Sequence, residues 1–267
     1  MGAVNGFDAS LDAIELDLLC TFAGVPAPFP LRVRSAGATA AERQAIFRTA
    51  RERLAARGLA DEHGPRGIAA VFVRLLRECP VTLDLMLAIG AERLGAVLIG
   101  RGDEAVLAIA ELTRTDPPAG IVALHTDDAV DELLRLIPAL GAAMLTPFSL
   151  PRKALVAVYR VLLDRAGRGA ALGGHELDDL LSTHGIDERL AHRMTTQLQP
   201  VLGNGQAGLA ERGGYAGDWR RVGEELRWLD TGHGRLKLAG TAEWTSVNPL
   251  FPNELYSAIR RLAATVP

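Results

Sequence analysis

The sequence predicts an α+β fold in which two similar halves share one core. Apolar residues recur at helical spacing up to residue 78, and strand-like segments joined by Gly- or Pro-bearing turns follow. The same order of helices, strands and a closing helix occurs again after residue 149. Joining the two sets of strands would hide two sheet edges, so we expect a pseudo-twofold arrangement around a central antiparallel sheet. The predicted halves, residues 1–141 and 149–267, form one compact unit, and Gly141–Phe148 has the composition of a linker.

Three helices open the first half. Ser10 can cap a helix over Leu11–Phe22, and the proline-rich run Val25–Pro30 ends it in an extended segment. Thr39 and Glu42 form a capping box for the second helix. A third helix, four strands and a closing helix follow, over 65–78, Leu83–Gly90, Arg93–Gly100, Glu104–Leu112, Ile121–His125 and Thr126–Pro138.

The second half repeats this order. Ser149 and Pro151 begin a helix whose apolar residues, from Leu155 to Leu162, recur at i, i+3, i+4 and i+7. Near the end of each half the residues themselves are similar, Asp131–Ile137 against Asn253–Ile259. The remaining predicted elements are two short helices, a strand, a meander and a last helix, over His175–Ser182, Asp187–Leu198, Gln206–Arg212, Glu225–Val247 and Phe251–Ala263.

The meander Glu225–Val247 has the clearest pattern in the chain. Apolar and charged residues alternate on both sides of Asp230–Gly234, whose two glycines suit a hairpin turn that needs positive φ. The Asp-Thr-Gly within this turn also occurs in aspartic proteases, where two such carboxylates share one proton. This sequence has a single copy and places His233 where those enzymes have Ser or Thr, so we interpret the segment as a structural turn.

The same meander contains three motifs in order: Trp228-Leu229-Asp230-Thr231, then Gly234-Arg235, then Trp244-Thr245-Ser246-Val247-Asn248-Pro249. Together they resemble the C-terminal pattern of the EspG family, the cytosolic chaperones of actinobacterial type VII (ESX) secretion, which bind PPE proteins. The resemblance extends from about Leu11 to Leu262. It implies a central antiparallel sheet flanked by helical bundles. It also implies a chaperone that covers the apolar tip of the PPE protein in a PE–PPE heterodimer, keeps it soluble and directs it to one secretion system.

The resemblance further implies a groove for the partner between the sheet and the C-terminal helical bundle, with a loop of the first strand set contributing. Strand alternation points Arg235 and Lys237 away from Leu236 and Leu238, so we expect an exposed basic pair at the rim. Arg235 also belongs to the motif, which leaves a structural role open, and core packing is the stronger explanation for any single leucine and for Met194. The candidate partner-binding residues are Arg101, Gly102, Asp103, Leu177, Leu180, Met194, Leu198, Arg235 and Lys237.

Composition limits the classes of function. A net charge of −3 gives no electrostatic reason to expect binding to nucleic acid or to an anionic membrane. The first residues lack the regions of a signal peptide and no apolar stretch reaches 18 residues, so we expect a cytoplasmic protein without membrane insertion. Cys20 and Cys79 lie beside apolar helical patterns, which favours buried thiols but leaves a disulfide open. The sequence also leaves open whether the free protein is a monomer or a weak homodimer.

Several shorter motifs suggest chemistry without the context that chemistry needs. Gly203–Gly208 matches the dinucleotide pattern, yet a helix precedes it and strand-like alternation follows. Arg101–Asp103 spells an adhesion tripeptide that a hairpin turn explains. His175, His184 and His192 form a histidine cluster without the spacing of a zinc site. We therefore expect no cofactor, no metal and no enzymatic activity. The alternative is an uncharacterised hydrolase or metal-dependent enzyme that uses this histidine region.

Overall fold

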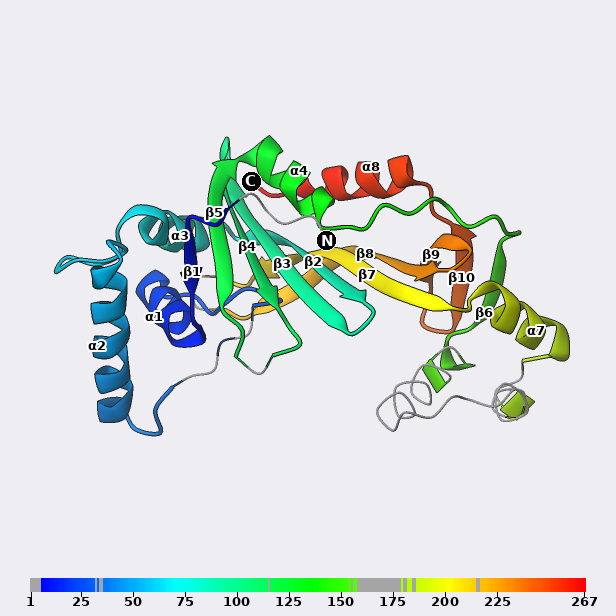
Figure 1. The fold of residues 1–267 in the computed structure, drawn as a ribbon, viewed down its shortest axis with the longest axis horizontal. Helices are drawn as coiled ribbons and strands as arrows, with labels where there is room; N and C mark the ends of the chain where they lie inside the picture. Colours follow the sequence, from blue (N-terminus) through cyan, green and yellow to red (C-terminus); the bar gives the residue numbers. More distant parts are fainter. Residues whose placement is uncertain are drawn as a thin grey trace. The chain divides into compact units, whose positions relative to one another are not determined.

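The structure is a computed structural model that describes residues 6–31, 33, 36–114, 116–154, 156–157, 179, 182–183, 186–214 and 217–267, which form an α+β fold (Figure 1). Contacts group the chain into two compact units. Unit 1 is Met1–Pro138, Gly205–Glu225 and Tyr256–Pro267, and unit 2 is Ala139–Asn204 and Leu226–Leu255. The elements are β1 (Ala9–Leu11), α1 (Ala13–Ala23), α2 (Ala40–Ala56), α3 (Gly67–Glu78), β2 (Val81–Ile89), β3 (Glu92–Arg101), β4 (Glu104–Glu111), β5 (Ala119–His125), α4 (Thr126–Arg135), β6 (Phe148–Pro151), α7 (Glu188–Gln197), β7 (Val201–Arg212), β8 (Trp219–Thr231), β9 (Gly234–Gly240), β10 (Trp244–Pro249) and α8 (Pro252–Ala263).

The element order confirms the predicted α+β class. Strands β2 to β5 follow one another and precede α4, and strands β7 to β10 follow one another and precede α8. Within each set, strands that are consecutive in the chain are neighbours in the sheet. The last strand of each set also pairs with an earlier strand, β5 with β1 and β10 with β6. The division into two consecutive halves related by a pseudo-twofold axis stays a prediction.

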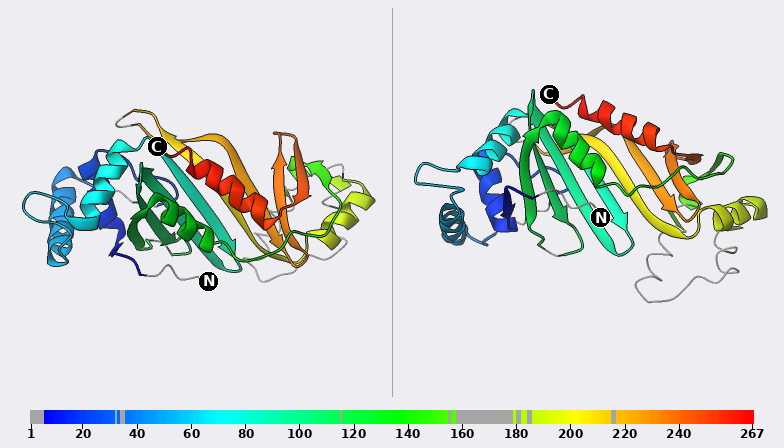
Figure 2. Two further views of the ribbon diagram at one scale, coloured as in Figure 1. Left: turned by 90° about the horizontal axis from the view of Figure 1, so that it is seen from above. Right: turned by 45° about the horizontal axis from the view of Figure 1, so that its top comes forward.

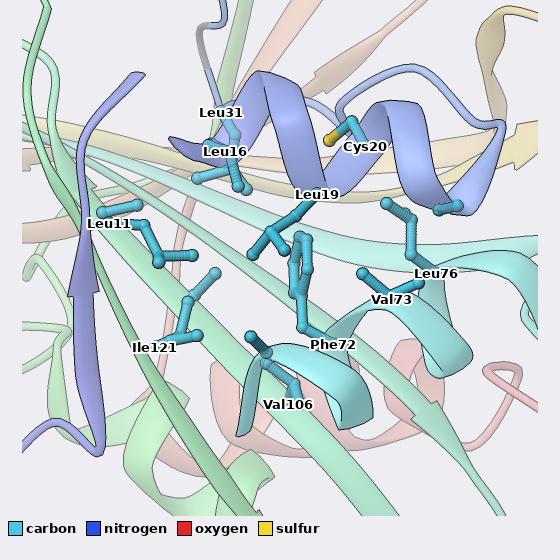
Figure 3. Close-up of a cluster of buried hydrophobic side chains, with 14 of the residues drawn as sticks. Leu11, Leu16, Leu19, Cys20, Leu31, Phe72, Val73, Leu76, Val106 and Ile121 are labelled. Atoms are coloured by element: carbon cyan, nitrogen blue, oxygen red, sulfur yellow. The ribbon is translucent and has the colours of Figure 1, made fainter. Parts of the chain in front are cut away.

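In unit 1, strands β3 to β5 are buried on both faces of the sheet. Its strand order is β1-β5-β4-β3-β2, followed by the parts of β7 and β8 that belong to this unit. Leu19 of α1 and Phe72 of α3 pack toward Val106 and Ile121 of the sheet (Figure 3). The residue after Val106, Leu107, is on the opposite face and is equally buried, because α4 packs on the same strands from that side. Burial on both faces explains why these strands are almost continuously apolar.

Helix α4 also lies beside the C-terminal part of α8 in unit 1 (Figure 2). An ion pair joins Asp131 of α4 to Arg260 of α8, with the two side chains 43% and 52% exposed. An ion pair this open to solvent contributes at most about 1 kcal/mol to stability.

The start of helix α1 differs from the prediction. Asp12, not Ser10, is the N-cap: its Oδ1 accepts the N–H groups of Ile14 and Glu15, each at 2.9 Å. The Glu15 Oε2 accepts the N–H of Asp12 at 3.0 Å, which completes a capping box. Ser10 lies instead in β1, which pairs with β5. Three residues are too few to show strand alternation, so the sequence pattern did not indicate β1.

Unit 2 is a smaller sheet covered by α7. Its strand order is β8-β9-β10-β6, with antiparallel pairs throughout, and β8 to β10 are the meander predicted for Glu225–Val247. One face carries an apolar cluster that includes Leu150 and Val247, and α7 packs Met194 and Leu198 into it. The sheet face and the helix therefore share one core.

The second half departs from the prediction at its first element. Ser149 and Pro151 lie in strand β6, and the first helical residue is Arg152. Pairing of β6 with β10 decides this, because only tertiary contact supplies the partner strand. The Leu155–Leu162 stretch lies largely outside the described residues, as does His175–Ser182. Strand β7 contains the whole Gly203–Gly208 motif, which therefore opens no helix.

The two cysteines are free and buried, as the apolar patterns around them predict. The Cys79 Sγ donates a hydrogen bond to the carbonyl of Gly100 at 3.0 Å. Burial raises the pKa of Cys20 to about 12 and that of Cys79 to about 11, so both stay thiols at neutral pH.

We predict that Gly234→Ala destabilises the protein by about 2–4 kcal/mol. Gly234 has φ of +116°, and a Cβ there would lie 2.6 Å from the backbone nitrogen of Ala143. Gly90→Ala is the control, because Gly90 also has positive φ (+57°) but open space around it, so only about 1 kcal/mol is expected. Urea denaturation of both variants measures the difference. Equal losses would show that the approach of residues 142–143 to the turn does not constrain it.

Candidate functional site

The β3–β4 turn, Arg101 to Asp103, is exposed and fixed at both ends. The carbonyls of Gly102 and Asp103 accept hydrogen bonds from the hydroxyl and N–H of Thr126, at 2.8 and 3.1 Å. The Gly102 N–H donates to the carbonyl of Pro267 at 3.2 Å, and Arg101 Nη1 contacts Glu78 Oε2 at 3.0 Å. The turn thus has a defined backbone while its side chains face solvent.

Met194 and Leu198 are core residues of unit 2. Their exposed fractions are 5% and 6%, and they pack with Leu236 and Val247. In this structure they are not accessible to a partner. Leu177 and Leu180 lie outside the described residues.

Arg235 is buried, so the expected exposed pair of cations is wrong at this position. Its side chain is 1% exposed, with Nε 2.6 Å from Asp230 Oδ1 and Nη2 2.8 Å from Asp230 Oδ2. The guanidinium carbon lies 5.8 Å from the centre of the Trp228 ring. Residues 230 and 235 are directly opposite in the β8–β9 register, and this part of the sheet face is covered. Strand alternation correctly predicted the face of the strand on which Arg235 lies, but it did not predict that this face is covered at that position.

The backbone around Arg235 joins three segments of unit 2. Its N–H donates to the carbonyl of Gly141 at 2.8 Å, and its carbonyl accepts from Ala143 and Leu250 at 3.1 and 3.0 Å. The Thr231 hydroxyl accepts from the N–H of His233 and donates to the carbonyl of Gly234. The motif residues therefore build a structural junction. The Asp230 carboxylate is engaged by Arg235 rather than poised as a protease carboxylate.

Lys237 is exposed, as predicted, but it does not lie with α7. Leu236 and Leu238 face the cluster that contains Met194, so Lys237, between them, is on the opposite face of the strand. The structure thus divides the predicted residues into an exposed turn in unit 1, buried residues in unit 2 and a single exposed lysine.

Unit 1 has a further surface cluster that sequence reasoning missed. Arg221 of β8 reaches across β7 to Asp84 of β2, with Nη2 2.9 Å from Oδ1 and Nη1 in contact with Oδ2. Its Nε is 2.7 Å from Glu225 Oε1. The guanidinium carbon lies 5.3 Å from the centre of the Phe29 ring, and Phe29 is 41% exposed. The result is a partly exposed aromatic ring over a closed network of charges.

A glycine in β7 makes this network possible. A Cβ at Gly208 of β7 would lie 2.9 Å from Arg221 Nη1, so glycine leaves the path across β7 open. Asp84 is fully buried, and burial raises the pKa of its carboxyl to about 6, while the Arg221 guanidinium acts in the opposite direction. The available sequence signals were a charged residue within an apolar strand and a glycine within the next.

Metal sites and membrane-spanning helices are both missing from the described part of the chain. Within it, no group of three or more His, Cys, Asp or Glu side chains could hold a metal ion. His192 is exposed on α7, and His175 and His184 lie outside the described residues. None of the described helices has the length and apolar character needed to cross a membrane.

Comparison with known proteins gives one family and one fold. The sequence model of the EspG family matches residues 12–261. A solved structure matches with a TM-score of 0.58 and 13% sequence identity, over 97% of this chain and 96% of the other. It is described as the Mycobacterium tuberculosis type VII secretion system chaperone EspG5 in complex with the PE25–PPE41 dimer. At this identity the likeness shows the fold. The search of curated proteins finds no match.

We predict that Asp230→Asn lowers the free energy of unfolding by about 3–5 kcal/mol, because it removes the carboxylate charge from the buried ion pair with Arg235. Asp131→Asn is the matched control, since it breaks the exposed pair with Arg260 and should cost at most about 1 kcal/mol. Urea denaturation measures both. A loss for Asp230→Asn as small as the control's would mean that the pair does not hold the junction.

Proposed function

This chain belongs to the EspG family, and on that premise we propose that it is a chaperone of a PPE protein in type VII secretion. It binds the apolar tip of the PPE protein in a PE–PPE heterodimer, keeps the pair soluble and directs it to its secretion system. The observation that carries the proposal is the match of the family over residues 12–261, almost the whole chain. The fold shared with EspG5, whose structure is described as a complex with the PE25–PPE41 dimer, supports it.

The physical task is to cover an apolar surface that would otherwise aggregate. This requires a preformed surface with some exposed apolar groups and a polar rim. The exposed candidates for the rim are the Arg101–Asp103 turn and Lys237. Leu177 and Leu180 complete the proposed contact set. Met194 and Leu198 are buried in the core of unit 2, where they pack against the sheet and stabilise it.

The proposed role is non-enzymatic and cytoplasmic. The competing proposal, a hydrolase or metal-dependent enzyme, would use the region of His175, His184 and His192. Metal analysis of the purified protein separates the two, because tight stoichiometric zinc would favour the enzyme. Co-expression with the PE–PPE pairs of the same genome tests the chaperone directly. A soluble complex with one pair is the expected result, and failure to bind any pair contradicts the proposal.

We predict that Lys237→Glu weakens binding to the cognate PE–PPE pair by about three- to tenfold at low ionic strength, mainly by slowing association. The melting temperature should barely change, because Lys237 is exposed. Lys153→Glu is the matched control, since Lys153 is the other lysine of the chain and is also exposed. Surface plasmon resonance across a salt titration measures both variants. Wild-type affinity of Lys237→Glu at every salt concentration would place the interface away from β9.

A further inference from the structure

We propose that Phe29 is an aromatic anchor that selects an apolar side chain at the tip of the PPE partner. The inference rests on the proposed function and adds to it a specific residue and the chemistry that this residue recognises. Phe29 lies in unit 1 and belongs to none of the motifs that the sequence indicated. Three features of the structure carry the proposal: a partly exposed ring, a rigid segment that carries it, and an Arg221 guanidinium beside it that already binds two carboxylates.

The segment that carries Phe29 is held on the sheet from both sides. Trp219 Nε1 donates to the carbonyl of Pro26 at 2.9 Å. On the other side, Pro30 occupies the space left by Gly95 of β3, where a Cβ would lie 2.6 Å from Pro30 Cγ. Prolines at 28 and 30 flank Phe29 and restrict the backbone further. The ring is therefore presented by a backbone with little conformational entropy left to lose on binding.

The ring itself also has a partner. The Arg221 guanidinium lies 5.3 Å from the ring centre, and Arg221 is held in turn by Asp84 and Glu225. Single exposed apolar residues are common on protein surfaces, and exposure alone means little. Phe29 differs because Arg221 of β8 lies over its ring and the next residue, Pro30, sits against Gly95 of β3, while the side chain remains 41% exposed. Rigid aromatic side chains of this kind are typical binding hot spots.

The charges around Phe29 favour a neutral apolar occupant. Arg221 uses its Nε for Glu225 and both terminal nitrogens for Asp84, and Nη1 also points at the carbonyl of Leu209 at 3.5 Å. An acidic side chain would meet two carboxylates beside a guanidinium that already donates to both of them. A basic side chain would have to compete with the Arg221 guanidinium for the same two carboxylates, of which Asp84 is fully buried. An apolar side chain can cover the ring without breaking this network.

The test compares Phe29→Ala with Phe22→Ala in the full-length protein. Phe22 is the matched control because it is the same residue type with nearly the same exposure, 39%, at the end of α1. We expect Phe29→Ala to raise the Kd for the cognate PE–PPE pair about tenfold or more, and Phe22→Ala to change it less than about twofold. Phe29→Leu keeps an apolar side chain but loses the ring, so an intermediate loss of about threefold is expected. Melting temperatures are measured for all three variants.

The outcomes separate the anchor from the chaperone role. Wild-type affinity in Phe29→Ala or Phe29→Leu, with the wild-type protein binding its pair, overturns the anchor alone. A wild-type protein that binds no PE–PPE pair overturns both proposals. If Phe29→Ala lowers the melting temperature, its loss of affinity could reflect a damaged fold, and the Phe29→Leu variant then decides the question. A loss of affinity in Phe29→Leu with an unchanged melting temperature supports the anchor, and an unchanged affinity contradicts it.

Discussion

The buried ion pair between Asp230 and Arg235 is the interaction on which unit 2 depends most. Removing two charges from water costs several kcal/mol for each ion, and only close, well-oriented contacts repay that cost. Two N···O contacts of 2.6 and 2.8 Å and the nearby Trp228 ring provide such an environment. Because the Arg235 backbone also binds Gly141 and Leu250, the pair fixes the point at which three segments meet. The motif shared with the EspG family is therefore a folding constraint rather than a reactive site.

The two edge strands of the sheet, β1 and β6, are protected in different ways. This matters for a protein whose proposed role is to prevent aggregation. Arg57 Nη1 donates to the carbonyl of Ser10 on β1 at 2.6 Å, so this edge group has a partner. On β6, the bond from the Arg152 N–H to the carbonyl of Glu243 fixes which residues face β10. Pro151, the neighbouring residue, points its backbone nitrogen away from β10 and has no N–H to offer another strand.

Sequence reasoning located the strands of the candidate site better than its accessible residues. Alternation placed Lys237 correctly on the face opposite Leu236, and the same rule placed Arg235 beside it. Lys237 is nonetheless exposed while Arg235 is buried, because cover over a sheet face comes from segments distant in sequence. Helical periodicity likewise identified Met194 and Leu198 as apolar positions without distinguishing a groove from a core. Phe29 was missed because its environment is built from β2, β3 and β8.

The sequence by itself determined the α+β class, the two strand sets, the turn at Gly232–Gly234 and the family. These depend on local signals, namely apolar period, capping residues and glycines with positive φ, which act within a few residues of one another. Tertiary structure decided that Ser149 and Pro151 form a strand, that Ser10 lies in β1 and that Arg221 crosses β7 to Asp84. Each of these needs a partner many residues away, or a short strand that only its neighbour stabilises. Long-range pairing, and the burial that follows from it, is not encoded in any single stretch of the chain.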